Sequence, residues 1–141
     1  MSQARTVLFD NEAVQALADP VHRKHRRVLA MVEAVAARNL RRAGSVRLVV
    51  PTAVRVEAGW DRRAAKAAGL NRLRVDEVPL DTARADRAAR VRTALGVSVA
   101  DAHLAASLRA TLGPHAVLTS DTGDARRIPE HLGIAATVVP V

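Results

Sequence analysis

Short apolar segments alternate with longer segments of helical character along the whole chain, and this alternation constrains the fold more than any other feature. The apolar segments are rich in Val and Leu, and residue types that begin a turn or a helix follow them. We predict strands over residues 6–9, 47–50, 74–80, 116–119 and 136–139. Strands that alternate with helices form a parallel sheet with right-handed crossovers. The sequence therefore predicts an α/β protein, a three-layer α/β/α sandwich around a central parallel sheet of four to five strands.

Helices are predicted between these strands, over residues 11–18, 21–42, 51–68, 82–95, 98–111 and 124–132. Pro20 separates the first two, and Gly44, Gly69, Gly96 and Gly133 stand where the longer helices are expected to end. No linker or internal repeat interrupts the 141 residues. We therefore expect one domain over residues 1–141.

Composition and motifs exclude several classes of protein. The chain has no cysteine, which excludes disulfides, thiolate zinc sites and cysteine nucleophiles. It shows no signal peptide and no apolar run near the roughly 18 residues that cross a bilayer, so a cytoplasmic protein without membrane contact is expected. Neither glycine pattern of nucleotide-binding loops occurs. Glu12 stands where a phosphatase of the haloacid dehalogenase type needs a second Asp.

The net charge of +8 comes mostly from arginine and favours a polyanionic partner such as RNA. An arginine-rich surface that reflects codon bias explains the charge equally well. Arg84, Arg87 and Arg90 recur at every third position of one predicted helix. This stripe is a candidate site for the RNA backbone, and an ordinary solvated helix face is the alternative.

Four acidic residues are expected at the carboxyl edge of the sheet, where ligands of such folds bind. Asp10 directly follows the first strand, and Asp121 follows the strand that ends at Thr119. Glu57 lies about 9 Å along a helix that leaves the second strand, and Asp101 lies in the first turn of another helix that begins at this edge. Carboxylates held together repel each other unless a cation such as Mg²⁺ or Mn²⁺ neutralises them. The pattern therefore predicts a divalent metal site.

Each acid also has an ordinary structural explanation. Asp10 suits the N-cap of the helix that follows it, and Ser98-x-x-Asp101 is a capping box. Glu57 is a solvated helix residue in the alternative view, and Asp121 shapes a turn. For Asp10 the functional interpretation is favoured because it lies at the carboxyl end of a strand, whereas the residues around Asp101 taken alone favour the cap.

Four segments resemble motifs of PIN domains and occur in the order found in that family. They are Thr-Val-Leu-Phe-Asp10, Val-Pro-Thr-Ala-Val-Arg-Val-Glu57, Asp101-Ala-His-Leu-Ala-Ala and Val-Leu-Thr-Ser-Asp121. Within the family, the chain looks like the VapC-type ribonuclease toxins of bacterial toxin–antitoxin modules, from Thr6 to Val139. One departure is Asn11, because Ser or Thr is frequent at that position in the family.

The resemblance implies a ribonuclease that depends on Mg²⁺ or Mn²⁺, with Asp10, Glu57, Asp101 and Asp121 as its catalytic and metal-binding quartet. Asp124 is a further candidate ligand, ranked below Asp121, because family members vary in which acid of this loop approaches the metal. The resemblance also implies a homodimer and a small antitoxin whose C-terminal segment enters the groove. The alternative is a PIN-like module that binds RNA or a protein without cutting. The RNA target and the number of metal ions stay open.

Overall fold

Five parallel strands form one sheet in the computed structural model, which describes residues 4–42 and 46–141. The order is β3-β2-β1-β4-β5, and each neighbouring pair is parallel. The strands are β1 (Thr6–Phe9), β2 (Arg47–Pro51), β3 (Val75–Val78), β4 (His115–Thr119) and β5 (Ala136–Pro140). The predicted parallel sheet is confirmed, with the larger of the two strand numbers expected.

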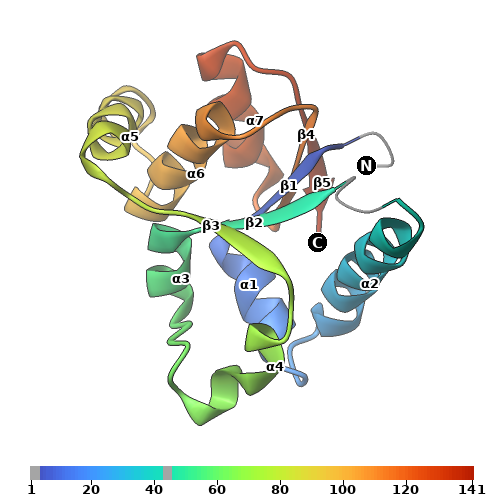
Figure 1. Ribbon diagram of the computed structural model, residues 1–141. Coiled ribbons are helices and arrows are strands. Elements are labelled where there is room, and N and C mark those ends of the chain that lie inside the picture. Colours follow the sequence, from blue (N-terminus) through green and yellow to red (C-terminus); the bar gives the residue numbers. More distant parts are fainter. Residues whose placement is uncertain (1–3, 43–45) are drawn as a thin grey trace.

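Helices cover both faces of the sheet (Figure 1). One layer contains α1 (Asn11–Ala18), α2 (His25–Arg41), α3 (Thr52–Ala58), the 3₁₀ turn η1 (Ala65–Ala67) and α4 (Ala68–Asn71). The opposite layer contains α5 (Thr82–Leu95), α6 (Val99–Ala110) and α7 (Thr122–Leu132). The expected three-layer α/β/α sandwich is therefore confirmed. None of the described helices is long and apolar enough to cross a membrane.

Alternate residues of the central strands point to the two helical layers. Val7 and Phe9 of β1 belong to the core on the side of α1, whereas Leu8 belongs to the core on the side of α6. In β4, Leu118 and Val117 divide in the same way. All five side chains are almost completely buried. This period of two, with both faces apolar, is what a sheet covered by helices on both sides requires.

The second helix is shorter than predicted. We expected a helix over residues 21–42, but α2 begins at His25, because residues 20–24 form turns in which the Asp19 side chain accepts the Val21 N–H at 3.0 Å. Val28, Val32 and Val35 form the buried face of α2, as the helical period requires. Gly44, which was expected to end this helix, lies outside the described residues.

The predicted helix over residues 51–68 was wrong in its length. α3 ends at Gly59, whose φ of 71° is left-handed, a conformation that glycine adopts without a steric penalty. Gly69, which we expected to end the helix, lies inside α4 instead. This early end leaves Glu57 in the last turn of a short helix beside the carboxyl edge of the sheet.

Candidate active site

A pocket of about 170 Å³ lies at the carboxyl edge of β1 and β4. Its lining contains all five acids predicted from the sequence, which are Asp10, Glu57, Asp101, Asp121 and Asp124. They come from the β1–α1 junction, α3, the first turn of α6 and the start of α7. The fold therefore brings together carboxylates that are far apart in the sequence.

Asp10 joins the end of β1 to the loop after β4. One carboxylate oxygen accepts the Ala13 N–H at 2.8 Å and caps α1, and the other accepts the Ser120 N–H at 3.3 Å. Burial raises the pKa of Asp10 above its usual value, against the lowering effect of hydrogen bonds from Thr119, Ala13 and Ser120. The Asp10 side chain thus caps α1 and also lines the pocket, as both interpretations of the sequence predicted.

Asp101 responds to the charges of the other acids. Burial is the main cause that raises its pKa, and the negative charges of Asp10, Glu57 and Asp124 raise it further. The Ser98 side chain opposes the shift, and its oxygen accepts the Asp101 N–H at 3.1 Å to cap α6. The carboxylates of the pocket are therefore close enough to disfavour each other's ionised form. A cation in the pocket would relieve this repulsion.

Asp121 and Asp124 both lie at the start of α7, but they are held differently. The Asp121 side chain caps the helix by accepting the Asp124 N–H at 3.1 Å. The Asp124 side chain accepts a hydrogen bond from Arg127 at 3.0 Å, and its charge contributes to the raised pKa of Asp101. Both acids line the pocket, so the choice of ligand between them stays a prediction.

Glu57 is an exposed member of the expected quartet, as Asp121 is, whereas Asp10 and Asp101 are partly buried. The apolar residues near it divide between two sides, because Val54 and Trp60 are buried whereas Val56 is 81% exposed. Glu57 has no hydrogen-bond or ion-pair partner within residues 4–42 and 46–141. Its carboxylate is therefore free to act on a water or an ion in the pocket.

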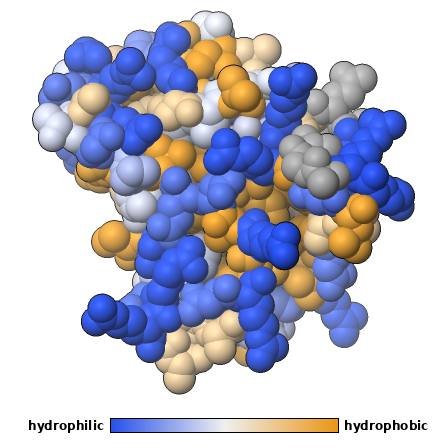
Figure 2. All heavy atoms as spheres, in the orientation of Figure 1, coloured by the Kyte–Doolittle hydropathy of each residue, from blue (hydrophilic) through white to orange (hydrophobic). Residues whose placement is uncertain are grey.

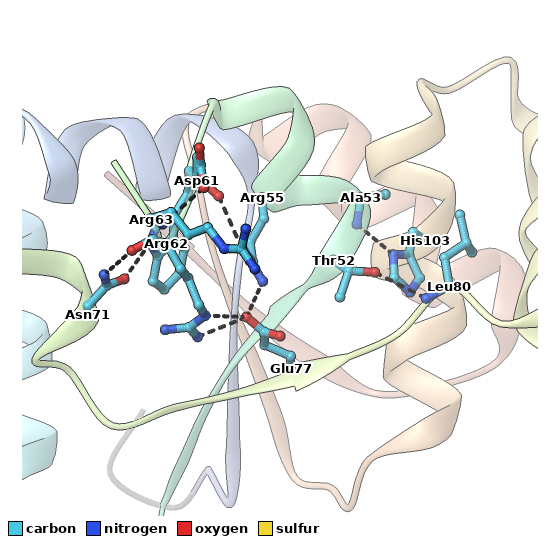
Figure 3. Close-up of polar contacts among 11 residues, drawn as sticks. Thr52, Ala53, Arg55, Asp61, Arg62, Arg63, Asn71, Glu77, Leu80 and His103 are labelled. Atoms are coloured by element: carbon cyan, nitrogen blue, oxygen red, sulfur yellow. Dashed lines mark hydrogen bonds and ion pairs between the residues drawn. The ribbon is translucent and has the colours of Figure 1, made fainter. Parts of the chain in front are cut away.

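A cluster of charged and aromatic side chains fixes α3, the helix that carries Glu57, to the edge strand β3 (Figure 3). Glu77 of β3 accepts hydrogen bonds from Arg55 at 2.6 Å and Arg62 at 2.8 Å. Both guanidinium groups also lie over the Trp60 ring, at 5.4 and 4.7 Å from its centre. These contacts hold the loop after α3 and limit the positions that Glu57 can take.

His103, to which the sequence analysis gave no role, connects the helices of Glu57 and Asp101. Its ring is completely buried, and Nδ1 accepts the Ala53 N–H of α3 at 3.1 Å (Figure 3). Nδ1 is thus unprotonated and Nε2 carries the proton, although Nε2 has no partner of good geometry in the described chain. Burial lowers the pKa of His103, and the Pro79 backbone partly opposes this shift. A histidine within an Ala- and Leu-rich helix was the available signal.

The chemical type of the side chains in the pocket suits a hard divalent cation, but their spacing in this structure does not yet form a binding site. Carboxylate oxygens are the ligands that Mg²⁺ and Mn²⁺ prefer. Among the described residues, however, no three His, Asp or Glu side chains are grouped closely enough to hold an ion as they stand. The acids therefore share one pocket and influence one another without forming a finished coordination shell.

Several solved structures have a similar fold, whereas no protein-family model and no curated protein matches the sequence. One of these structures is VapBC2 from Rickettsia felis, bound to a DNA fragment from its promoter, at 12% identity and a TM-score of 0.59 over 95% of this chain and 98% of that one. Another is FitAcB from Neisseria gonorrhoeae, at 18% identity and a TM-score of 0.53 over 93% and 96%. At such identities the likeness establishes the fold, which is PIN-like.

Proposed function

We propose that this protein is a ribonuclease that uses a divalent cation, Mg²⁺ or Mn²⁺, to hydrolyse phosphodiester bonds. The observation that carries the proposal is the convergence of the five predicted acids, and of Glu12 beside Asp10, from four parts of the chain on one pocket. The raised pKa of Asp101, caused in part by the other carboxylates, is further support. Glu57 lines the same pocket and its side chain has no cap or ion pair within the described residues, so its carboxylate is available to an ion or a water.

Each acid has a distinct task in this proposal. Asp10 and Asp101 would hold the cation together with Asp121 or Asp124, because all four line the pocket where α1, α6 and α7 begin at the edge of the sheet. A bound cation lowers the pKa of its water and neutralises charge on the phosphate. Glu57 would bind the cation or orient the attacking water.

The proposed substrate is RNA, and the proposed biological setting is a toxin–antitoxin module. The charge of +8 favours a polyanion, and neutralised phosphates release condensed counterions. The fold shared with VapBC2 and FitAcB, together with the four motifs, supports a toxin that forms a homodimer and binds a small antitoxin. The cleavage test below does not depend on these partners.

A second candidate function is a PIN-like module that binds RNA or protein without cutting. The observation that favours it is the spacing of the acids, none of which form a ready group of three in the described chain. The two functions differ in their response to metal. A cation that binds only the folded protein raises the free energy of unfolding, by about 2.7 kcal/mol when its concentration is a hundred times Kd, and therefore raises the melting temperature.

The experiment follows cleavage of a labelled structured RNA with Mn²⁺ and with EDTA, for the wild type and Asp101→Asn. We expect cleavage by the wild type with Mn²⁺ alone, and none by the variant. Thermal unfolding with Mn²⁺ provides the second readout. Neither cleavage nor a thermal shift in the wild type would exclude the nuclease and favour the binding module.

A further inference from the structure

A second pocket, of about 470 Å³, lies between α5, α6 and α7. Its polar lining consists of basic side chains only, and no acid of the described chain lines it. The lining residues are Arg87, Arg90, Val91, Ala105, Ala106, Arg109, His131 and Leu132. We infer that this basic groove binds backbone phosphates of the RNA strand that the acidic pocket cuts, an inference that rests on the proposed function.

The floor of the basic groove is made by small and apolar residues. Ala105 and Ala106 of α6 are completely buried and are too short to fill the space between the helices. Val91 of α5 is also buried, whereas Arg87 and Arg90 on the same helix are exposed at the rim. The corner of the molecule that α5 forms is covered mostly by hydrophilic residues (Figure 2). The groove thus combines a narrow apolar base with a charged rim.

One arginine of the basic groove is held in place by the fold. Arg109 donates from one terminal nitrogen to the Leu132 carbonyl oxygen at the C-terminal end of α7, at 2.7 Å. A guanidinium group has five N–H donors, so this contact leaves donors for a phosphate. Because its position is set before binding, Arg109 loses little conformational freedom when a ligand arrives.

The arginines at the rim of the groove differ from Arg84, which forms an ion pair within the protein. Arg84 pairs with Asp81 at 2.8 Å, and this separates it from the stripe predicted from the sequence. Arg87 and Arg90 have no ion pair or hydrogen bond with any described residue. Two unpaired guanidinium groups therefore face the same groove as Arg109. Unpaired guanidinium groups bind phosphate oxygens through two parallel N–H donors.

The basic groove and the acidic pocket are joined by the same helix. Asp101 lies in the first turn of α6 and Arg109 near its end, eight residues or about 12 Å along the axis. A strand that lies along α6 would thus contact the groove with some phosphates and present another to the acids. This arrangement separates the positive charges that bind from the negative charges that would hold the cation.

The test measures the binding of a labelled single-stranded RNA to the full-length protein at several NaCl concentrations, with EDTA present so that no cleavage occurs. Each lost contact with a phosphate reduces the slope of log K against log [salt] by about 0.7 for a single strand. We expect Arg87→Gln with Arg90→Gln to reduce the slope by about 1.4. The matched control is Arg26→Gln with Arg27→Gln, which removes the same charge from exposed positions of α2 on the other side of the sheet.

The control pair should leave the slope unchanged, and polyglutamate should compete much less well than unlabelled RNA. Equal effects of the two pairs, or no effect of either, would overturn the inference, because general charge would then explain binding. Equal competition by polyglutamate would also overturn it, since the groove would then recognise any polyanion. Binding without metal is independent of cleavage. A wild type that binds through the groove but never cuts would leave the groove as a binding site for RNA phosphates and refute the nuclease.

Discussion

Asp10 combines two roles that two substitutions separate. Its side chain caps α1 by accepting the Ala13 N–H at 2.8 Å, and its charge faces the acidic pocket. Asp10→Asn keeps an oxygen that can accept this hydrogen bond but removes the charge, whereas Asp10→Ala removes both. Asn and Asp are similar N-caps, and Ala is a poor one. Both variants lose the oxygen that accepts the Ser120 N–H, so the difference in stability between them reports mainly the cap.

The expected size of this difference follows from the cap and the chain length. Loss of an N-cap costs typically about 1 kcal/mol. The entropy of unfolding is about 2.1 cal/mol/K per residue, or about 0.3 kcal/mol/K for 141 residues. Asp10→Ala should therefore melt about 3 °C below Asp10→Asn. Asp10→Asn should be at least as stable as the metal-free wild type at neutral pH, because burial raises the pKa of Asp10 and disfavours its ionised form.

The assay combines thermal unfolding in EDTA with RNA cleavage in Mn²⁺. Both Asp10 variants should lose cleavage, although only Asp10→Ala loses the cap. Asp81 provides the control, because it caps α5 by accepting the Arg84 N–H at 2.9 Å and does not line the acidic pocket. Its Asn and Ala variants should show a similar difference in melting temperature and unchanged cleavage. Equal melting temperatures of the two Asp10 variants would refute the capping argument, and full cleavage by Asp10→Asn would refute the site.

Three further predictions concern stability. Asp101→Asn should be more stable than the metal-free wild type at neutral pH in urea unfolding, and the advantage should shrink as the pH falls and wild-type Asp101, whose pKa is raised, becomes protonated. Because the pKa of His103 is lowered in the folded protein, the unfolded chain takes up a proton at this residue at a higher pH than the folded protein does. The wild type should therefore lose stability relative to His103→Leu as the pH falls below about 6.5, and a constant difference between the two would contradict this. Glu77→Gln should cost roughly 1 kcal/mol in urea unfolding because it weakens the two ion pairs that join β3 to α3 and to the loop after it. An unchanged midpoint would show that these ion pairs do not stabilise the fold.

The fold was predictable because its signals are local. Val7, Leu8 and Phe9 form a strand with both faces apolar, which indicates a sheet covered on both sides. The end of α3 was missed because the Ala-rich segment after Trp60 has the composition of a helix, whereas the left-handed conformation of Gly59 ends it. The prediction followed the Ala-rich composition of the segment and overlooked Gly59, the residue that ends the helix.

The acids of the candidate site were predictable from topology, but their surroundings were not. Asp10 follows a strand and Asp101 lies in the first turn of a helix, so the parallel sheet alone places both at the same edge. Sequence order does not indicate that His103 contacts Ala53, fifty residues away, because this contact depends on how α3 and α6 pack. It also does not indicate which arginine of a stripe is already paired, as Arg84 is.

Anomalous diffraction from crystals soaked in Mn²⁺ tests the central claim most directly, because it locates the ion without reference to activity. The account predicts a peak inside the acidic pocket, within about 2.0–2.3 Å of carboxylate oxygens of Asp10 and Asp101, or one water further away. No peak in this pocket, or a peak elsewhere on the protein alone, would contradict the claim that these carboxylates share a divalent cation.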